Sequence, residues 1–203
     1  MRIIAGEFRS RVLKTFEGKG IRPMLDRARQ TLFDRLRDRA SEAEDVLDLF
    51  AGTGSLGLES LSRGASRVTF VEKAPASLAV LRENVAALSL EGPRVRILPG
   101  AALEVAGRLA ASGERFDLVF LDPPYPETRP GPAADAFREA LAGGLIRALT
   151  RPGAAVVLHV EEGSELPRIG GFSPFDTRPV GESLVGIACR DDEDGPRAPA
   201  AGG

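Results

Sequence analysis

From residue 45 onward, short apolar segments rich in β-forming residues alternate with segments of helical periodicity. The apolar segments predict strands at 45–50, 68–72, 94–98, 116–121 and 154–159, and helices are expected near 55–62, 75–88, 101–110 and 133–149. Near-continuous apolar strands between helices are typical of a parallel sheet that is covered on both faces. The pattern therefore predicts a doubly wound α/β domain.

The pattern changes after residue 163. Segments 175–180 and 183–190 are separated by Gly181-Glu182, which favours an antiparallel hairpin added to the edge of the sheet. Residues 41–190 are thus expected to form one domain with a mostly parallel, seven-stranded sheet. Residues 191–203 are acidic and then rich in Pro, Ala and Gly, so we expect a disordered tail.

The N-terminal 40 residues differ from the rest in charge. Residues 1–39 contain 11 Lys and Arg against 5 Asp and Glu, whereas the remainder contains 16 against 24. An extended stretch at 2–14 precedes a helix whose apolar face carries Leu25, Ala28, Leu32, Phe33 and Leu36. A basic extension on an acidic body is typical of an arm that contacts phosphates, the alternative being a solvated, arginine-rich helix face.

Composition excludes several other classes. With Cys189 as the single cysteine and His159 as the single histidine, neither a disulfide framework nor a zinc site is expected. No apolar stretch approaches the roughly 20 residues that cross a bilayer, and the N-terminus lacks a signal-peptide pattern. We expect a cytoplasmic protein without a metal or a membrane segment.

A glycine-rich loop, Ala51-Gly52-Thr53-Gly54-Ser55-Leu56-Gly57, follows the first strand and leads into a helix. Such a loop at the carboxyl end of a strand favours a nucleotide-like ligand, and its glycines also satisfy the dinucleotide fingerprint of a nicotinamide oxidoreductase. Asp48 suits a ligand that carries an ammonium group, which favours S-adenosylmethionine. Glu72, at the end of the second strand, is expected to accept hydrogen bonds from both ribose hydroxyls.

The tetrapeptide Asp122-Pro123-Pro124-Tyr125 follows the strand at 116–121 and should face the same crevice as the glycine loop. The exocyclic amine of a base is a weak nucleophile because its lone pair is delocalised into the ring. The Asp122 carboxylate and the Pro123 carbonyl can accept its N–H bonds, while Pro124 offers no backbone donor and Tyr125 can stack on the base. These four residues are the candidate catalytic set for an amino-methyltransferase. Pro-Pro as a simple strand terminator is the alternative.

Other polar groups fit this chemistry less well. Methylation at a pyrimidine ring carbon would need a cysteine nucleophile, whereas Cys189 lies on a late strand and is expected to be structural. His159 is interpreted as a strand-end residue rather than a catalyst.

At this point the sequence resembles a known family, the bacterial 16S rRNA guanine-N2 methyltransferases of the RsmD type. The resemblance spans residues 2–190 and rests on four stretches, 2–6 with Arg9 and Arg11, 22–33, 48–59 and 121–125. The second stretch, with its Arg-Pro-x-x-Asp-Arg-x-Arg pattern, is the discriminating one. The resemblance implies a Rossmann-like, class I S-adenosylmethionine-dependent methyltransferase fold and methyl transfer to N2 of a guanine in 16S rRNA, within the 30S subunit or an assembly intermediate.

The resemblance also implies residue roles. The expected cofactor-binding residues are Asp48, Phe50, Ala51, Gly52, Thr53, Gly54, Glu72, Lys73, Gly100, Ala101 and Asp122. The expected RNA-binding residues are Arg2, Arg9, Arg11, Arg22, Arg27 and Arg29. Gly100 is a departure, because the family typically has Asp or Asn there to bind the adenine amino group, so backbone groups at Gly100 or Ala101 would have to replace it.

Three other functions remain open at this point. A DNA adenine-N6 or cytosine-N4 methyltransferase could use the same tetrapeptide, but outside the N-terminal extension no segment is large enough to read DNA sequence. A nicotinamide oxidoreductase is disfavoured by Asp48. A non-catalytic RNA-binding module would have no need of Asp122 and its two prolines.

Overall fold

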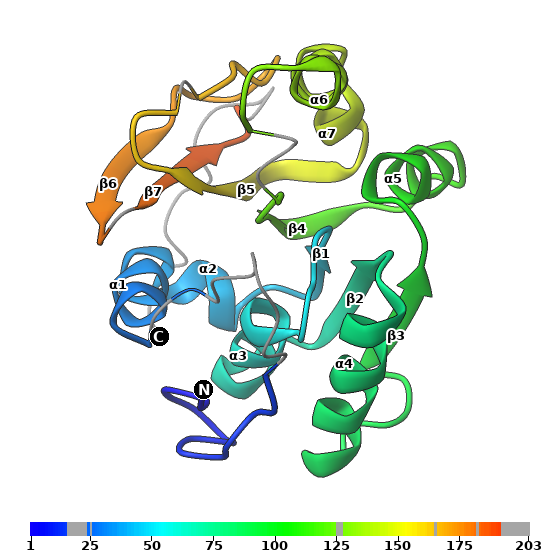
Figure 1. Cartoon of the computed structure of the whole chain (residues 1–203), viewed down its shortest axis with the longest axis vertical. Coiled ribbons are helices and arrows are strands. Elements are labelled where there is room, and N and C mark those ends of the chain that lie inside the picture. Colours follow the sequence, from blue (N-terminus) through cyan, green and yellow to red (C-terminus); the bar gives the residue numbers. More distant parts are fainter. Residues whose placement is uncertain (16–23, 25, 125–127, 165, 182, 192–203) are drawn as a thin grey trace, which may run out of the picture.

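The computed structural model describes residues 1–15, 24, 26–124, 128–164, 166–181 and 183–191. Its centre is a seven-stranded sheet of order β3-β2-β1-β4-β5-β7-β6 (Figure 1). The strands are β1 (Asp45–Asp48), β2 (Arg67–Glu72), β3 (Val95–Pro99), β4 (Phe116–Leu121), β5 (Thr150–Glu161), β6 (Asp176–Val180) and β7 (Ser183–Cys189). The helices are α1 (Asp26–Leu36), α2 (Asp38–Ser41), α3 (Ser55–Arg63), α4 (Pro75–Ala87), α5 (Ala102–Ala111), α6 (Pro132–Ala142) and α7 (Leu145–Ala148).

Strands β1 to β5 are parallel, and β7 pairs antiparallel with both β5 and β6. The predicted parallel sheet with a C-terminal antiparallel hairpin is therefore confirmed. From β1 the chain builds outward in one direction to β2 and β3, and then in the other direction to β4 and β5. A ligand-binding crevice is expected at such a reversal, at the carboxyl ends of β1 and β4.

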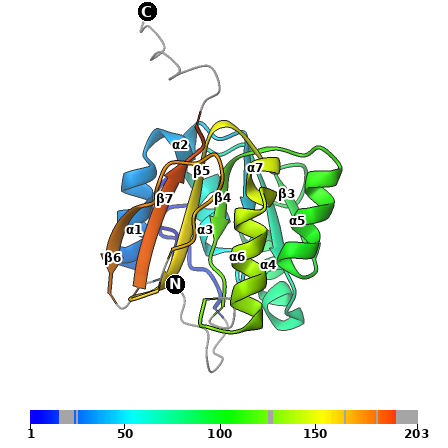
Figure 2. The ribbon, with the colours of Figure 1, turned by 90° about the horizontal axis from the view of Figure 1, so that it is seen from above.

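Two apolar clusters cover the two faces of the sheet. The first contains side chains from α1, α3 and α4, such as Leu32, Leu58 and Leu81. The second contains side chains from α5, α6 and α7, such as Val105 and Phe137. Figure 1 shows the sheet between these two groups of helices, and Figure 2 shows the same layers from above. Burial on both faces explains why the strands are so apolar.

The N-terminal segment is anchored to the C-terminal half of α3 (Figure 1). The buried carboxylate of Glu59 accepts hydrogen bonds from the backbone nitrogens of Ile4 and Ala5 at 2.8 and 3.2 Å. Gly6 lies so close to α3 that a Cβ atom there would be 1.7 Å from the carbonyl oxygen of Ser62. This part of the expected extension is thus packed against the sheet domain through specific backbone contacts.

Three predicted elements differ from the structure by more than one residue. The strand expected at 154–159 is longer and runs from Thr150 to Glu161 as β5. The helix expected at 133–149 is divided into α6 and α7 at Gly143-Gly144, where Gly144 has a φ of 87°. Helical periodicity continues through this point, but the left-handed backbone ends the first helix. The first strand ends at Asp48 and not at residue 50, because Leu49 and Phe50 already form the turn into the glycine loop.

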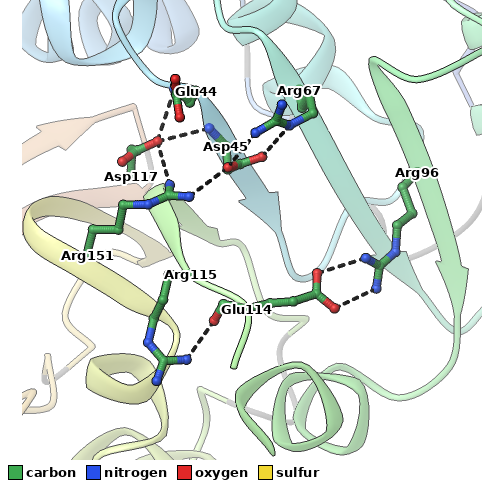
Figure 3. A network of polar contacts seen from close by, with 8 residues as sticks. All are labelled: Glu44, Asp45, Arg67, Arg96, Glu114, Arg115, Asp117 and Arg151. Carbon is green, nitrogen blue, oxygen red and sulfur yellow. Dashed lines mark hydrogen bonds and ion pairs between the residues drawn. The ribbon is translucent and has the colours of Figure 1, made fainter. Parts of the chain in front are cut away.

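Charged residues close the amino-terminal edge of the sheet, opposite the expected site. Arg151 bridges Asp45 and Asp117 at 2.8 and 2.9 Å, and Arg67 makes two hydrogen bonds to Asp45 (Figure 3). A cleft of about 530 Å³ lies at this edge. Arg67 and Arg151 line this cleft, and both are bonded to carboxylates of the same network. We therefore interpret the network as structural: it joins the amino-terminal ends of neighbouring strands.

Two general properties follow from the described part of the chain. It contains no helix with both the length and the apolar character needed to cross a membrane. Within the same residues, no group of three or more His, Cys, Asp or Glu side chains is arranged to hold a metal ion.

Candidate active and cofactor site

Four polar side chains are placed on one face of the sheet at its carboxyl edge: Asp48, Glu72, Asp122 and His159. Each lies two positions beyond a side chain of the first apolar cluster, and side chains two apart on a strand share a face. The four core residues are Val46, Phe70, Phe120 and Val157. Four strands that are distant in sequence therefore deliver carboxylates and an imidazole to the same edge.

The glycine loop is built by close packing on one side and is open on the other. Gly52 and Gly54 have φ values of 54° and 87°, and the Gly54 nitrogen donates to the Ala51 carbonyl at 2.7 Å. A Cβ atom at Gly54 would lie 2.4 Å from Cδ1 of Leu81, whereas a Cβ atom at Gly52 would meet nothing within 4 Å. The open side of the loop at Gly52 allows a ligand to approach the backbone.

Asp48 is almost completely buried, with 1% of its surface exposed. Its Oδ2 atom accepts a hydrogen bond from the Gly57 nitrogen in the first turn of α3 at 3.1 Å, while Oδ1 has no partner among the described residues. Burial is the main cause that raises the pKa of Asp48 to about 7, and the charges of Asp122 and Glu72 add to it. A cationic group at Oδ1 would satisfy this atom and favour the ionised form.

The Glu72 carboxylate is held by three backbone groups. Oε2 accepts from the Gly52 nitrogen at 2.8 Å, and Oε1 accepts from the nitrogens of Lys73 and Ala74 at 2.8 and 2.7 Å. A carboxylate has about four acceptor positions, so about one remains, on the oxygen next to Gly52. This geometry leaves room for one ribose hydroxyl more readily than for the two expected from the sequence.

Asn84 on α4 is a site residue that the sequence did not reveal. Its Nδ2 donates to the Thr53 carbonyl of the glycine loop at 2.9 Å and to the Lys14 carbonyl at 3.0 Å. Its Oδ1 accepts from the Lys14 nitrogen at 2.8 Å. One buried amide therefore joins the basic N-terminal segment to the cofactor loop. Its sequence signal is only its helical spacing, three residues after Leu81 and one before Val85, which are buried on the same side of α4.

Asp122 follows β4, and Pro123 beside it is buried while Pro124 is exposed. The Nδ1 atom of His159 lies 2.8 Å from Oδ1 of Asp122. Leu121 pairs with Leu158 in the parallel register, so the next residues along, Asp122 and His159, are lateral neighbours. His159 was expected to be only a strand-end residue, and no sequence signal identified its contact, because the contact depends on this register. Tyr125 lies outside the described residues.

The other expected cofactor residues surround this edge. The Phe50 ring packs edge-on against Phe137 with centroids 5.9 Å apart, and the Ala51 nitrogen donates to the Val71 carbonyl. Gly100 follows β3 and donates its backbone N–H to the Glu72 carbonyl, so that N–H is already bonded. Ala101 caps the start of α5, and the side chain of Lys73 is exposed.

The candidate RNA contacts fall into three groups. Arg2, Arg9, Arg11 and Arg27 are exposed, whereas Arg22 lies outside the described residues. Arg29 is different, because its side chain is fully buried and donates to Asp26 at 3.0 Å and to the Arg2 carbonyl. The expectation that Arg29 contacts RNA is therefore wrong, since its guanidinium anchors α1 to the N-terminal segment. Alternate positions of a helix face opposite sides, and Arg29 lies three residues before Leu32 and four before Phe33, on the apolar face. This spacing was the signal that could have separated Arg29 from Arg27.

Comparison with known proteins gives consistent matches. The Haemophilus influenzae and Escherichia coli K12 proteins named Ribosomal RNA small subunit methyltransferase D are 38% and 39% identical to this chain over 125 residues, or 62% of it. The aligned part spans 64% and 60% of these two relatives, less than two thirds of their length. A solved structure described as the putative methyltransferase yhhF from Escherichia coli is 30% identical, with a TM-score of 0.77, and the match covers 95% of this chain and 99% of that one.

The family described as Conserved hypothetical protein 95 matches residues 1–187, nearly the whole described sequence. The match includes the basic N-terminal segment, the glycine loop and β4 with the Asp122 that follows it. This chain therefore belongs to the Conserved hypothetical protein 95 family, the RsmD family that its motifs resemble.

Proposed function

We propose that this protein transfers a methyl group from S-adenosylmethionine to the exocyclic N2 amine of a guanine in 16S rRNA. The observation that carries the proposal is the position of Asp122-Pro123 at the same sheet edge as Asp48, Glu72 and the glycine loop. A cofactor cradle and an acceptor for an amine are thus adjacent. The names of the curated relatives support small-subunit rRNA as the substrate.

The residues of the cradle fit S-adenosylmethionine. The unpartnered Oδ1 of Asp48 matches an ammonium donor, and the remaining acceptor position of Glu72 matches a ribose hydroxyl. The open side of Gly52 leaves room for a ligand against the loop. When bound, the cofactor supplies a methyl group on a positively charged sulfur. A pyrophosphate would instead meet the carboxylates of Asp48 and Glu72, which disfavours a nicotinamide cofactor.

The chain's own contribution is to orient the amine. Oδ1 of Asp122 is bonded to His159, and the other carboxylate oxygen is proposed to accept an N–H of the target amine. The Pro123 carbonyl supplies a second acceptor, and Pro124 has no backbone N–H that would otherwise crowd the amine. Two fixed acceptors draw the nitrogen toward tetrahedral geometry and make its lone pair available. Tyr125 is proposed to stack on the base, which must be unpaired or flipped out to expose N2.

The exposed arginines of the N-terminal segment and α1 are proposed to hold the RNA backbone. Four of them are exposed: Arg2, Arg9, Arg11 and Arg27. Arg22 is proposed to act with them. The substrate is proposed to be rRNA within the 30S subunit or an assembly intermediate. DNA methylation is not favoured, because the curated relatives at 38% and 39% identity are named for ribosomal RNA.

Labelled S-adenosylmethionine tests the proposal. The protein is incubated separately with 30S particles, deproteinised 16S rRNA and duplex DNA, and the methylated nucleoside is identified. We expect N2-methylguanosine in RNA and its loss in Asp122→Ala. Label in DNA only, or in methyladenosine, would contradict the proposed substrate, and full activity of Asp122→Ala would contradict the proposed chemistry.

A further inference from the structure

Asp122 and His159 form a pair that comes from two neighbouring strands. The imidazole Nδ1 lies 2.8 Å from Oδ1 of Asp122, and 11% of the His159 side chain is exposed against 35% for Asp122. The more buried partner is thus the imidazole, while part of the carboxylate faces the open edge of the sheet. In this arrangement the buried His159 side chain can hold Asp122 in place, while Asp122 remains accessible to a ligand.

Building on the proposed methyl transfer, we propose that His159 is a positioning residue that holds one oxygen of Asp122 so that the other is fixed toward the target amine. A carboxylate on a loop after a strand can rotate about its side-chain bonds. A hydrogen bond from a ring on the rigid strand β5 removes that freedom before the substrate arrives. His159 acts through Asp122 and needs no contact with the substrate.

The charge of the pair also depends on pH. Burial lowers the pKa of His159, but the hydrogen bond and the charge of Asp122 outweigh burial and raise it above its ordinary value. A protonated imidazole neutralises Asp122 and makes it a weaker acceptor, whereas a neutral imidazole leaves the pair with its negative charge. The turnover rate is therefore expected to rise with pH as His159 loses its proton.

Other charged groups flank the pair. On β5 itself, Glu161 lies two positions beyond His159 on the same face and is bonded to Arg129. On the parallel side, Asp48 on β1 interacts with Asp122, and Glu72 on β2 interacts with Asp48. On the antiparallel side, His159 pairs with the uncharged Val185 on β7, beyond which lies Arg178 on β6. Asp48 has a pKa of about 7, so its own titration would contribute to a pH profile taken through neutral pH, and the profile must be measured at saturating S-adenosylmethionine.

Two variants separate the hydrogen bond of His159 from the volume of its side chain. His159→Phe fills the space without a donor, and its turnover rate is expected to fall about 10- to 100-fold, with the cofactor dissociation constant changed less than about threefold. His159→Asn keeps an N–H near the Nδ1 position but cannot titrate. Its turnover rate is expected to be close to that of the wild type at high pH. Unlike the wild-type rate, it should not decrease as the pH is lowered.

A spectroscopic measurement tests the pair without turnover. Because His159 is the only histidine of the chain, its imidazole signals in an NMR titration of the untagged protein are unambiguous. We expect its pKa to fall in Asp122→Asn, where burial remains but the charge is gone. An unchanged pKa would overturn the pairing. If the wild type transfers methyl groups and His159→Phe does so at the same rate, this inference alone is overturned. If the wild type methylates no RNA, the proposed function is overturned and this inference with it.

Discussion

The Glu72 carboxylate accepts a hydrogen bond from the Gly52 nitrogen at 2.8 Å, which ties the end of β2 to the glycine loop that follows β1. One side chain therefore shapes the loop and presents the acceptor that a ribose hydroxyl would use. The relationship joins the first two ligand-binding motifs across adjacent parallel strands, and it makes Glu72 the most informative residue for cofactor binding.

Replacement of Glu72 should weaken S-adenosylmethionine binding. In Glu72→Gln one acceptor oxygen becomes an amide donor, which opposes either Gly52 or the N–H groups of Lys73 and Ala74. Hydrogen bonds to charged groups contribute about 1.5–3 kcal/mol, so a loss of at least about tenfold in affinity is expected by calorimetry. Glu114→Gln, at the opposite edge in the pair with Arg96, is the matched control and should bind normally. Equal affinity of the Glu72 variant and the control would argue against the ribose role.

Asp48→Asn should stabilise the free protein at pH 8 while weakening cofactor binding. The pKa of Asp48 is about 7 in the folded protein, above its ordinary value of 3.8, so the folded state binds the proton more tightly. Its contribution to stability thus increases as pH falls from about 7 toward about 4, and ionisation at pH 8 is unfavourable. Asparagine removes that penalty, which is on the order of a few kcal/mol.

Urea unfolding of the cofactor-free wild type and of Asp48→Asn at pH 5 and pH 8 measures this pH dependence of stability. The difference in unfolding free energy between Asp48→Asn and the wild type should be larger at pH 8 than at pH 5. A gap that does not depend on pH would show that Asp48 is ionised in the folded protein throughout this range.

Arg27→Ala and Arg29→Ala should affect different properties although both residues lie on α1. Arg27 is exposed, so its removal should weaken RNA binding, reduce the salt dependence by about one ion and change stability by no more than about 0.5 kcal/mol. Arg29 is fully buried, so its truncation should leave a cavity and cost about 2–4 kcal/mol of unfolding free energy.

Filter binding at several salt concentrations, together with chemical unfolding, separates the two variants. Thermal or urea curves that rank Arg27→Ala as the less stable protein would contradict the burial seen on α1. A normal RNA salt dependence in Arg27→Ala would remove this residue from the proposed RNA surface.

Asn84→Ala should loosen both the N-terminal segment and the glycine loop. The change leaves the Lys14 backbone and the Thr53 carbonyl without their amide partner, at a cost of about 1–3 kcal/mol for each polar group that stays buried. Hydrogen exchange should become faster at Lys14, and cofactor affinity should fall. Glu83→Gln removes the exposed Lys14–Glu83 ion pair beside it and is the control, with little effect on either. Protection at Lys14 that survives in Asn84→Ala would refute the coupling.

The sequence by itself determined the type of fold and the strand ends that carry the site. Alternating apolar and helical segments specify a parallel sheet because only strands buried on both faces tolerate such continuous apolar character. Asp48, Glu72 and Asp122 could be assigned to one edge because each follows a predicted parallel strand, and the carboxyl ends of such strands meet there.

Only the tertiary structure decided which polar groups meet. The pairing of His159 with Asp122 depends on the register between β4 and β5, which hydrophobic periodicity does not specify. The bond from Arg29 to the Arg2 carbonyl and the three bonds of Asn84 depend on where the N-terminal segment packs on the domain. Periodicity reports which side of an element is apolar, whereas register and packing between distant segments determine the partner of each polar side chain.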